Sequence, residues 1–223
     1  MRVSYNGDFS VTMPDLSDYN MMNAAEKLEF ERLAGYYTNS DIVYQFNLAN
    51  LYNERLRRVQ SGVDTYWLSE PVRLGFVHKH NLYVDGGDDA MTYGLGVSYA
   101  STDGVMKKSN REVLGFNIDL RYRKGKFRFD NKFTLDYTIA NNPPQAFSVY
   151  VQTNPYYEKD YEGSTPKYLD NRTLSTSSSD EGGWPVKRVN PLYNDGLNYL
   201  DATKELAFRN NFQMEWRPVD GLV

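Results

Sequence analysis

The feature that most constrains this chain is a run of apolar and polar alternation between residues 73 and 138. In its third stretch, Leu114, Phe116 and Ile118 alternate with Asn117 and Asp119. A repeat of two residues places successive side chains on opposite faces of a β-strand. The pattern therefore predicts four strands in succession, over residues 73–85, 91–101, 112–122 and 126–138.

The same alternation occurs at residues 2–13 and 205–217, which predicts six strands in all. Each strand has about 10 residues or more, against about 5 to 6 in soluble proteins, and this length suits a tilted span of a bilayer. The polar faces carry charges such as Asp119 and Arg121, which would be costly to bury in a sandwich core. One face against lipid and one against water fits both observations. A one-sided antiparallel sheet in solvent explains the alternation but not the strand length.

The connections differ sharply in length. Residues 86–90 and 124–125 are predicted tight turns, whereas residues 14–72 and 140–203 are long. The first long connection contains two predicted helices, one after a capping box at Asn23 and one over residues 48–59. Short turns at one end and long loops at the other are typical of outer-membrane barrels, with the short turns in the periplasm.

The expected fold is therefore mainly β: an antiparallel transmembrane β-barrel segment of about six long strands. Two short helices lie in an early extracellular loop, and one long extracellular loop follows. Because even the smallest membrane barrels have about 8 strands, the remaining strands are expected outside this chain. The N-terminus begins directly in strand pattern without the features of a signal peptide, which also indicates a fragment.

Composition agrees with this interpretation. A mean hydropathy of -0.66 argues against a helical membrane protein, and 19 Tyr, 11 Phe and 3 Trp suit interfacial aromatic girdles. A net charge of -4 and a pI near 5.3 argue against a nucleic-acid partner. Arg55, Arg57 and Arg58 are interpreted as a solvated helix face.

Several strings, taken in order, resemble SusC/RagA-type TonB-linked outer-membrane transporters, a class of TonB-dependent receptor. They are Val3-Ser-Tyr-Asn-Gly-Asp-Phe9, Asn23-Ala-Ala-Glu-Lys-Leu-Glu-Phe-Glu31, Tyr66-Trp67, His80-Asn-Leu-Tyr-Val-Asp-Gly-Gly87 with Tyr93, Gly104-Val-Met-Lys-Lys-Ser109, Gly115-Phe-Asn-Ile118 and Phe127-Arg-Phe-Asp-Asn131. By this resemblance, residues 1–223 are the amino-terminal part of the transporter β-barrel, with the plug domain and the remaining strands absent.

The resemblance implies transport rather than catalysis. Such proteins import a nutrient, an oligosaccharide or glycan or in some members a peptide, across the outer membrane of a Gram-negative bacterium. The implied partners are a SusD-like surface lipoprotein, the TonB complex that supplies energy, and outer-membrane lipid. No cofactor is implied.

Candidate ligand-binding residues lie in the second long connection, where Tyr156, Tyr157 and Trp184 stand among amides and carboxylates. Aromatic faces with such neighbours suit sugar rings. They also suit loop packing or contact with a lipoprotein, which is the interpretation that we favour for any single tyrosine. No catalytic, cofactor or metal site is predicted. His78 and His80 share one strand face but lack a third ligand nearby in sequence. No nucleophile–base pair or carboxylate pair indicates a hydrolase.

A rival hypothesis is a soluble or surface-attached β-rich glycan-binding module, in which these three aromatic residues bind sugar without transport. The strand faces separate the two hypotheses. A transporter barrel needs one continuous apolar band for lipid, whereas a soluble module needs a second layer over that band.

Overall fold

The computed structural model describes residues 1–177, 183–198 and 200–219 and divides into two compact units. The sheet unit comprises residues 1–14, 73–143 and 200–223, and the insertion unit comprises residues 15–72 and 144–199. The insertion unit is thus made from the two long connections, of which the first joins the first two strands of the sheet.

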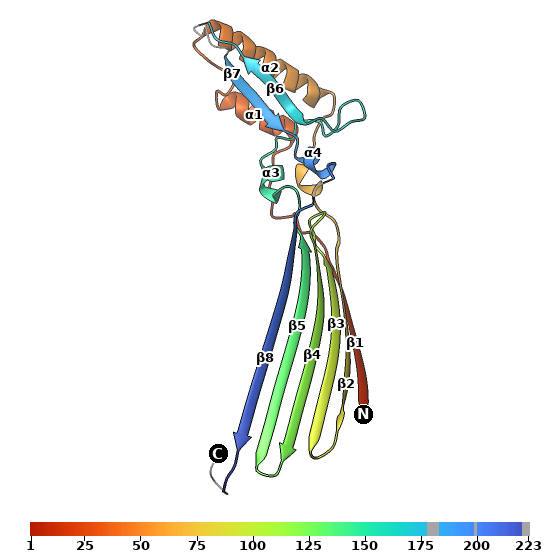
Figure 1. The fold of residues 1–223 in the computed structure, drawn as a ribbon. Helices are drawn as coiled ribbons and strands as arrows, with labels where there is room; N and C mark the ends of the chain where they lie inside the picture. The colour runs from red at the N-terminus through yellow and green to blue at the C-terminus, as the bar shows by residue number, and fades with distance from the viewer. Residues whose placement is uncertain (178–182, 199, 220–223) are drawn as a thin grey trace. The chain divides into compact units, whose positions relative to one another are not determined.

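The sheet unit is a six-stranded antiparallel sheet in the order β1-β2-β3-β4-β5-β8 (Figure 1). The strands are β1 Arg2–Thr12, β2 Gly75–Gly87, β3 Met91–Asp103, β4 Asn110–Lys124, β5 Phe127–Asn141 and β8 Ala202–Trp216. β1 and β8 are its two edges, so the sheet is not closed within the described residues. All six predicted strands are confirmed, with bounds that differ by a few residues.

The two tight turns are also confirmed. In the turn between β2 and β3, the Asp88 carboxylate accepts the backbone N–H groups of Ala90 and Met91 at 2.9 and 2.8 Å. Gly87 has a φ of 137°, and a Cβ there would lie 2.1 Å from the Met91 carbonyl oxygen. Only glycine fits this backbone without displacing the turn.

The first long connection contains α1 Ala24–Leu33, α2 Ile42–Gln60 and the short 3-10 helix η1 Trp67–Ser69. The capping box before α1 is confirmed, because Asn23 Oδ1 accepts the Glu26 N–H and Glu26 Oε2 accepts the Asn23 N–H. α2 begins six residues before the predicted Leu48. Asp41 caps it by accepting the Tyr44 N–H at 2.8 Å, a start signal that the apolar spacing alone does not reveal.

The second long connection is not the featureless loop that its sequence suggests. It contains α3 Phe147–Val151, the antiparallel pair β6 Tyr168–Leu174 and β7 Trp184–Val189, and α4 Pro191–Asp195. These elements have 5 to 7 residues, too few for a periodic pattern to show in the sequence. No helix in the described part of the chain is long and apolar enough to cross a membrane.

Candidate functional site

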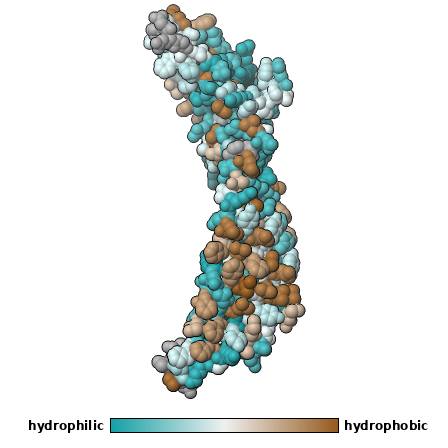
Figure 2. Space-filling view, in the orientation of Figure 1, coloured by the Kyte–Doolittle hydropathy of each residue, from teal (hydrophilic) through white to brown (hydrophobic). Residues whose placement is uncertain are grey.

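The first candidate functional surface is the apolar face of the sheet. The strand register brings the apolar positions of all six strands to one side, and Figure 2 shows these side chains gathered over the strands. One row across the sheet is Tyr5, Leu82, Val97, Phe116, Leu135 and Phe208. Tyr5 is 64% exposed and Phe208 75% exposed. Within the described residues, this face therefore has no covering layer.

The apolar band runs obliquely to the strands. On β2 it extends from Phe76 to Val84, whereas on β8 it starts at Leu206, which the register places in the row of His80. The band thus shifts by about four to six residues over the four strand steps from β2 to β8. With about 3.4 Å per residue and about 4.8 Å between strands, this slope is about 35–47°. A level lipid band therefore requires strands tilted by nearly the angle of membrane barrels, about 35–45°.

Two histidines interrupt the apolar band on β2. His78 Nδ1 lies 3.2 Å from His80 Nε2, and His80 Nδ1 lies 2.7 Å from the Tyr5 hydroxyl. These polar atoms therefore pair with one another. Among the residues that the structure describes, no group of three or more His, Cys, Asp or Glu side chains gathers as a metal site would.

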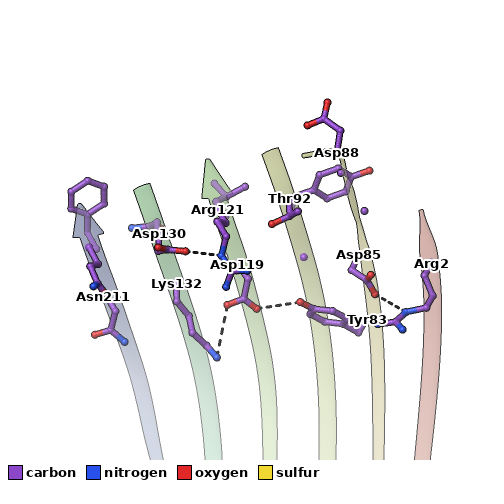
Figure 3. Close-up of a pocket in the computed structure, with 18 of the residues that line it drawn as sticks. Arg2, Tyr83, Asp85, Asp88, Thr92, Asp119, Arg121, Asp130, Lys132 and Asn211 are labelled. Atoms are coloured by element: carbon purple, nitrogen blue, oxygen red, sulfur yellow. Dashed lines mark hydrogen bonds and ion pairs between the residues drawn. The ribbon is translucent and has the colours of Figure 1, made fainter. Parts of the chain in front are cut away.

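The opposite face of the sheet is polar and bears a hollow of about 1290 Å³ near the turn between β2 and β3. Figure 3 shows its charged side chains projecting from neighbouring strands. Arg2 lies 3.1 Å from Asp85, and Arg121 lies 2.8 Å from Asp130. Acidic and basic groups pair between neighbouring strands, so the hollow offers hydrogen-bond donors and acceptors to a polar solute or a polar protein surface.

Asp119 links three strands across this polar face. It accepts a hydrogen bond from the Tyr83 hydroxyl at 3.3 Å and lies 3.8 Å from Lys132 Nζ. Tyr83 belongs to β2 and Asp119 to β4, so the ring must cross β3, where the register pairs Gly94 with Asp119. A Cβ on Gly94 would lie 1.9 Å from the Tyr83 hydroxyl oxygen. The glycine thus provides the space for this contact.

The insertion unit is held together by an aromatic cluster around Arg55. Its guanidinium lies 4.7 Å from the ring centroid of Tyr156 and 5.8 Å from that of Tyr157, and it donates a hydrogen bond to the Tyr157 hydroxyl at 3.0 Å. Glu31 and Asp170 lie 3.6 and 3.8 Å from its nitrogens. The expected solvated face is thus wrong for Arg55, which is buried at 3% exposure. Its carboxylate and aromatic partners make burial of the charge tolerable.

Burial also changes the acidity of the tyrosines in this cluster. It raises the pKa values of Tyr37, Tyr156 and Tyr157 above the ordinary phenol value, because a phenolate is poorly solvated there. The nearby Arg55 cation opposes this effect without cancelling it. The hydroxyl groups therefore stay protonated at neutral pH, and those of Tyr37 and Tyr156 donate hydrogen bonds to Glu31 at 2.6 and 3.1 Å.

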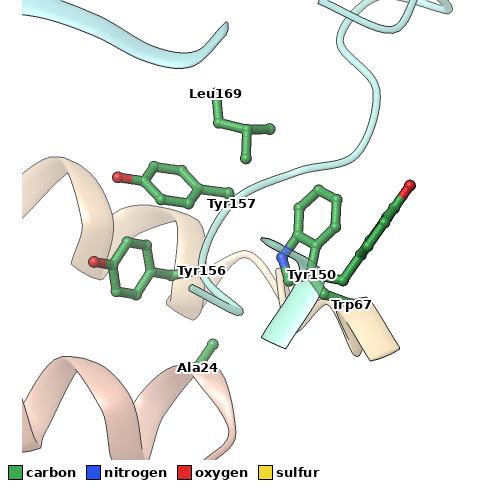
Figure 4. Close-up of a cluster of buried hydrophobic side chains, with 6 residues drawn as sticks. All are labelled: Ala24, Trp67, Tyr150, Tyr156, Tyr157 and Leu169. Carbon is green, nitrogen blue, oxygen red and sulfur yellow. The ribbon is translucent and has the colours of Figure 1, made fainter. Parts of the chain in front are cut away.

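The three predicted ligand-binding residues have different surroundings. Tyr156 and Tyr157 lie together, with ring centroids 4.9 Å apart, and are 0% and 2% exposed (Figure 4). Trp184, at the start of β7, is 66% exposed. The two tyrosines thus pack the connections against each other, and only Trp184 offers surface for direct contact. Ligand binding at the three residues stays a prediction.

Sequence reasoning missed the participation of Arg55, although a signal was present. Leu48, Leu51 and Arg55 follow the spacing of one helix face, and all three are buried. Glu31 was missed as well, although it follows Ala24 and Leu28 on the buried face of α1. The burial of Asp170 at 4% has no comparable signal in the local sequence.

Comparison with known proteins identifies a related fold. No protein-family model matches the chain, and no curated protein matches it. The chain is similar to part of the solved structure of the RagAB peptide transporter, with a TM-score of 0.66 and 12% sequence identity over 99% of this chain. It spans 26% of the length of that solved chain. At this identity, the similarity concerns the fold.

Proposed function

We propose that this chain is part of the wall of an outer-membrane β-barrel transporter of the SusC/RagA type. The observation that carries the proposal is the apolar band, which continues across all six strands and has a charged face behind it. Lipid is the solvent that such a band requires, and a water-filled or protein-filled interior suits the other face. The oblique course of the band and the fold similarity to a transporter add support.

The transporter imports a nutrient, an oligosaccharide or glycan or a peptide, with energy from the TonB complex. The two tight turns face the periplasm, and the two long connections are extracellular, because long loops of membrane barrels lie on that side. A SusD-like lipoprotein is the proposed partner of the extracellular loops. Residues 1–223 form the amino-terminal part of the barrel, and further strands pair with the edges β1 and β8. The chain has no proposed catalytic role.

The rival glycan-binding module finds less support. It needs a second layer over the apolar face, and the apolar side chains of that face are largely exposed in the described residues. It also needs accessible sugar-binding aromatics, and of its three candidates Tyr156 and Tyr157 are buried and only Trp184 is exposed.

The experiment that tests the proposal is fractionation of cells that express the full reading frame containing this chain. We expect recovery in the outer membrane and a heat-dependent shift in gel mobility, since folded barrels resist detergent until they are heated. Recovery as a soluble, folded monomer would overturn the transporter proposal and favour the glycan-binding module.

A further inference from the structure

A small pocket in the insertion unit has no part in the surfaces described above. Its volume is about 120 Å³. We name it the Met pocket after two of its lining residues, Met21 and Met22. The other lining residues are Asn23, Asp64, Thr65, Tyr66, Trp67, Leu68, Thr153 and Pro155. Both long connections thus contribute to its wall.

Hydrogen bonds between the two connections fix the wall of the Met pocket. The Thr65 N–H donates to the Pro155 carbonyl oxygen at 2.8 Å, and the Trp67 indole N–H donates to the Asn154 carbonyl oxygen at 3.0 Å. Trp67 and Leu68 are each 1% exposed, so they close the inner side. A pocket that is already formed spares its ligand the cost of ordering the wall.

The rim of the Met pocket is accessible and adaptable. Met21, Met22 and Tyr66 are 39%, 43% and 44% exposed. Methionine side chains are unbranched and polarisable, so they fit apolar groups of varied shape. An apolar group can therefore enter from this side and displace water from the two thioethers.

The polar lining groups are largely engaged within the protein, including the lining carboxylate of Asp64, whose Oδ1 accepts the Ala24 N–H at 2.8 Å. The Asn23 side chain accepts the Glu26 N–H, the Thr65 hydroxyl donates to the Tyr157 carbonyl oxygen, and the Thr153 hydroxyl donates to the Val149 carbonyl oxygen. A sugar ring would bury hydroxyl groups with few partners here, which is unfavourable. An aliphatic group has no such requirement, so the chemistry of the lining favours it.

The volume of the Met pocket limits the size of the group that it can bind. An engineered apolar cavity of about 150 Å³ in another protein binds benzene. A pocket of about 120 Å³ suits the smaller, four-carbon side chain of leucine or isoleucine. We propose that the Met pocket binds one aliphatic side chain of a peptide substrate. This inference rests on the proposed import function and selects peptides among its substrates.

The test measures binding of short synthetic peptides to the complete transporter, purified with its lipoprotein. The peptides differ only in carrying leucine or glycine at one position, which is moved along the sequence. We expect the best leucine peptide to bind about tenfold more tightly than its glycine counterpart. Met22→Glu should abolish this preference and leave the affinity for the glycine peptide unchanged, because the added carboxylate opposes burial of an aliphatic group.

Two control variants make the test specific. Leu33→Glu places the same charge on α1 at a residue that is 70% exposed and does not line the pocket, and it should retain the leucine preference. Met22→Leu retains an apolar wall and should also keep it. All three variants are compared in the same binding assay, and an unchanged affinity for the glycine peptide shows that each variant is folded.

Several results would overturn the inference. One is the absence of a leucine preference in the unmodified protein, and another is an unchanged preference in Met22→Glu. Loss of the lipoprotein from Met22→Glu with peptide selectivity retained would assign the pocket to the lipoprotein instead. Failure of the proposed transport function would appear separately, as absence of the protein from the outer membrane.

Discussion

At the scale of single residues, Arg55 connects parts of the chain that lie far apart in sequence. Its hydrogen bond to Tyr157 spans 102 residues, and its ion pair with Asp170 reaches β6. A buried charge of this kind is stable only while its partners are in place. The insertion unit therefore depends on this one side chain more than on any exposed arginine of the same helix.

We expect Arg55→Leu to destabilise the insertion unit by about 3–5 kcal/mol, because it leaves Glu31 and Asp170 buried without their cation. Limited proteolysis of residues 15–72 and 144–199 in the full protein measures the effect. The matched control is Arg57→Leu on the exposed face of α2, for which we expect about 0.5 kcal/mol or less. Equal protease resistance of the two variants would contradict the prediction that the stability of the insertion unit depends on Arg55.

Gly94 is the second residue with a specific steric role. We expect Gly94→Ala to displace Tyr83 from Asp119 and to cost about 1 kcal/mol, the usual value of one hydrogen bond. The cost should shrink in a Tyr83→Phe background, where the hydroxyl is already absent. A double-mutant cycle on the thermal midpoint of the gel-mobility shift measures this coupling. Additive effects would show that the glycine is required for another reason.

At the scale of elements, buried tyrosines join the helices of the first connection to the second connection. Burial raises the pKa values of Tyr37, Tyr150, Tyr156 and Tyr157 above those of the unfolded chain, which are near 10. Below about pH 10 both states are protonated, and the packing contributes fully to stability. Above it the unfolded chain loses protons first, so stability falls as pH rises.

We therefore expect the insertion unit to open in a cooperative step above about pH 10. Tyrosinate absorbance and protease sensitivity should rise together in this step, after the exposed tyrosines have ionised. Tyr161→Phe removes a tyrosine that is 62% exposed and should leave the midpoint unchanged. Independent titration of all tyrosines with no loss of protease resistance would contradict the expected linkage.

At the scale of the whole molecule, the two faces of the sheet define its surroundings. Phe208 and Ala207 are neighbours on β8, and the register places them on the apolar and the polar face. If lipid covers the apolar face, Phe208→Arg should destabilise the barrel by about 2–4 kcal/mol. Ala207→Arg should have little effect, because it adds a charge opposite Asp136 on the polar face.

The measurement is the unfolding midpoint of each variant in detergent or lipid, compared with the unmodified protein. In a solvated sheet, both substitutions lie on exposed surface and should stay within about 0.5 kcal/mol. Similar midpoints for the two variants would therefore argue against a lipid-facing side.

The sequence by itself determined the strands, their two faces, the tight turns and the start of α1. These features follow from local rules: a period of two, turn residues and a capping box act within a few residues of one another. The resemblance of short strings likewise pointed to a transporter, and the fold similarity to a transporter supports that proposal.

Only the tertiary structure decided the organisation of the long connections. It joined two segments separated by the sheet into one unit, buried Arg55, Tyr156 and Tyr157, and formed the Met pocket from both segments. Helical spacing places Arg55 on the buried face of α2, but the partners that surround it and the tyrosines lie about a hundred residues away. A local pattern contains no information about such partners, and so the sequence could not separate buried aromatics from exposed ones.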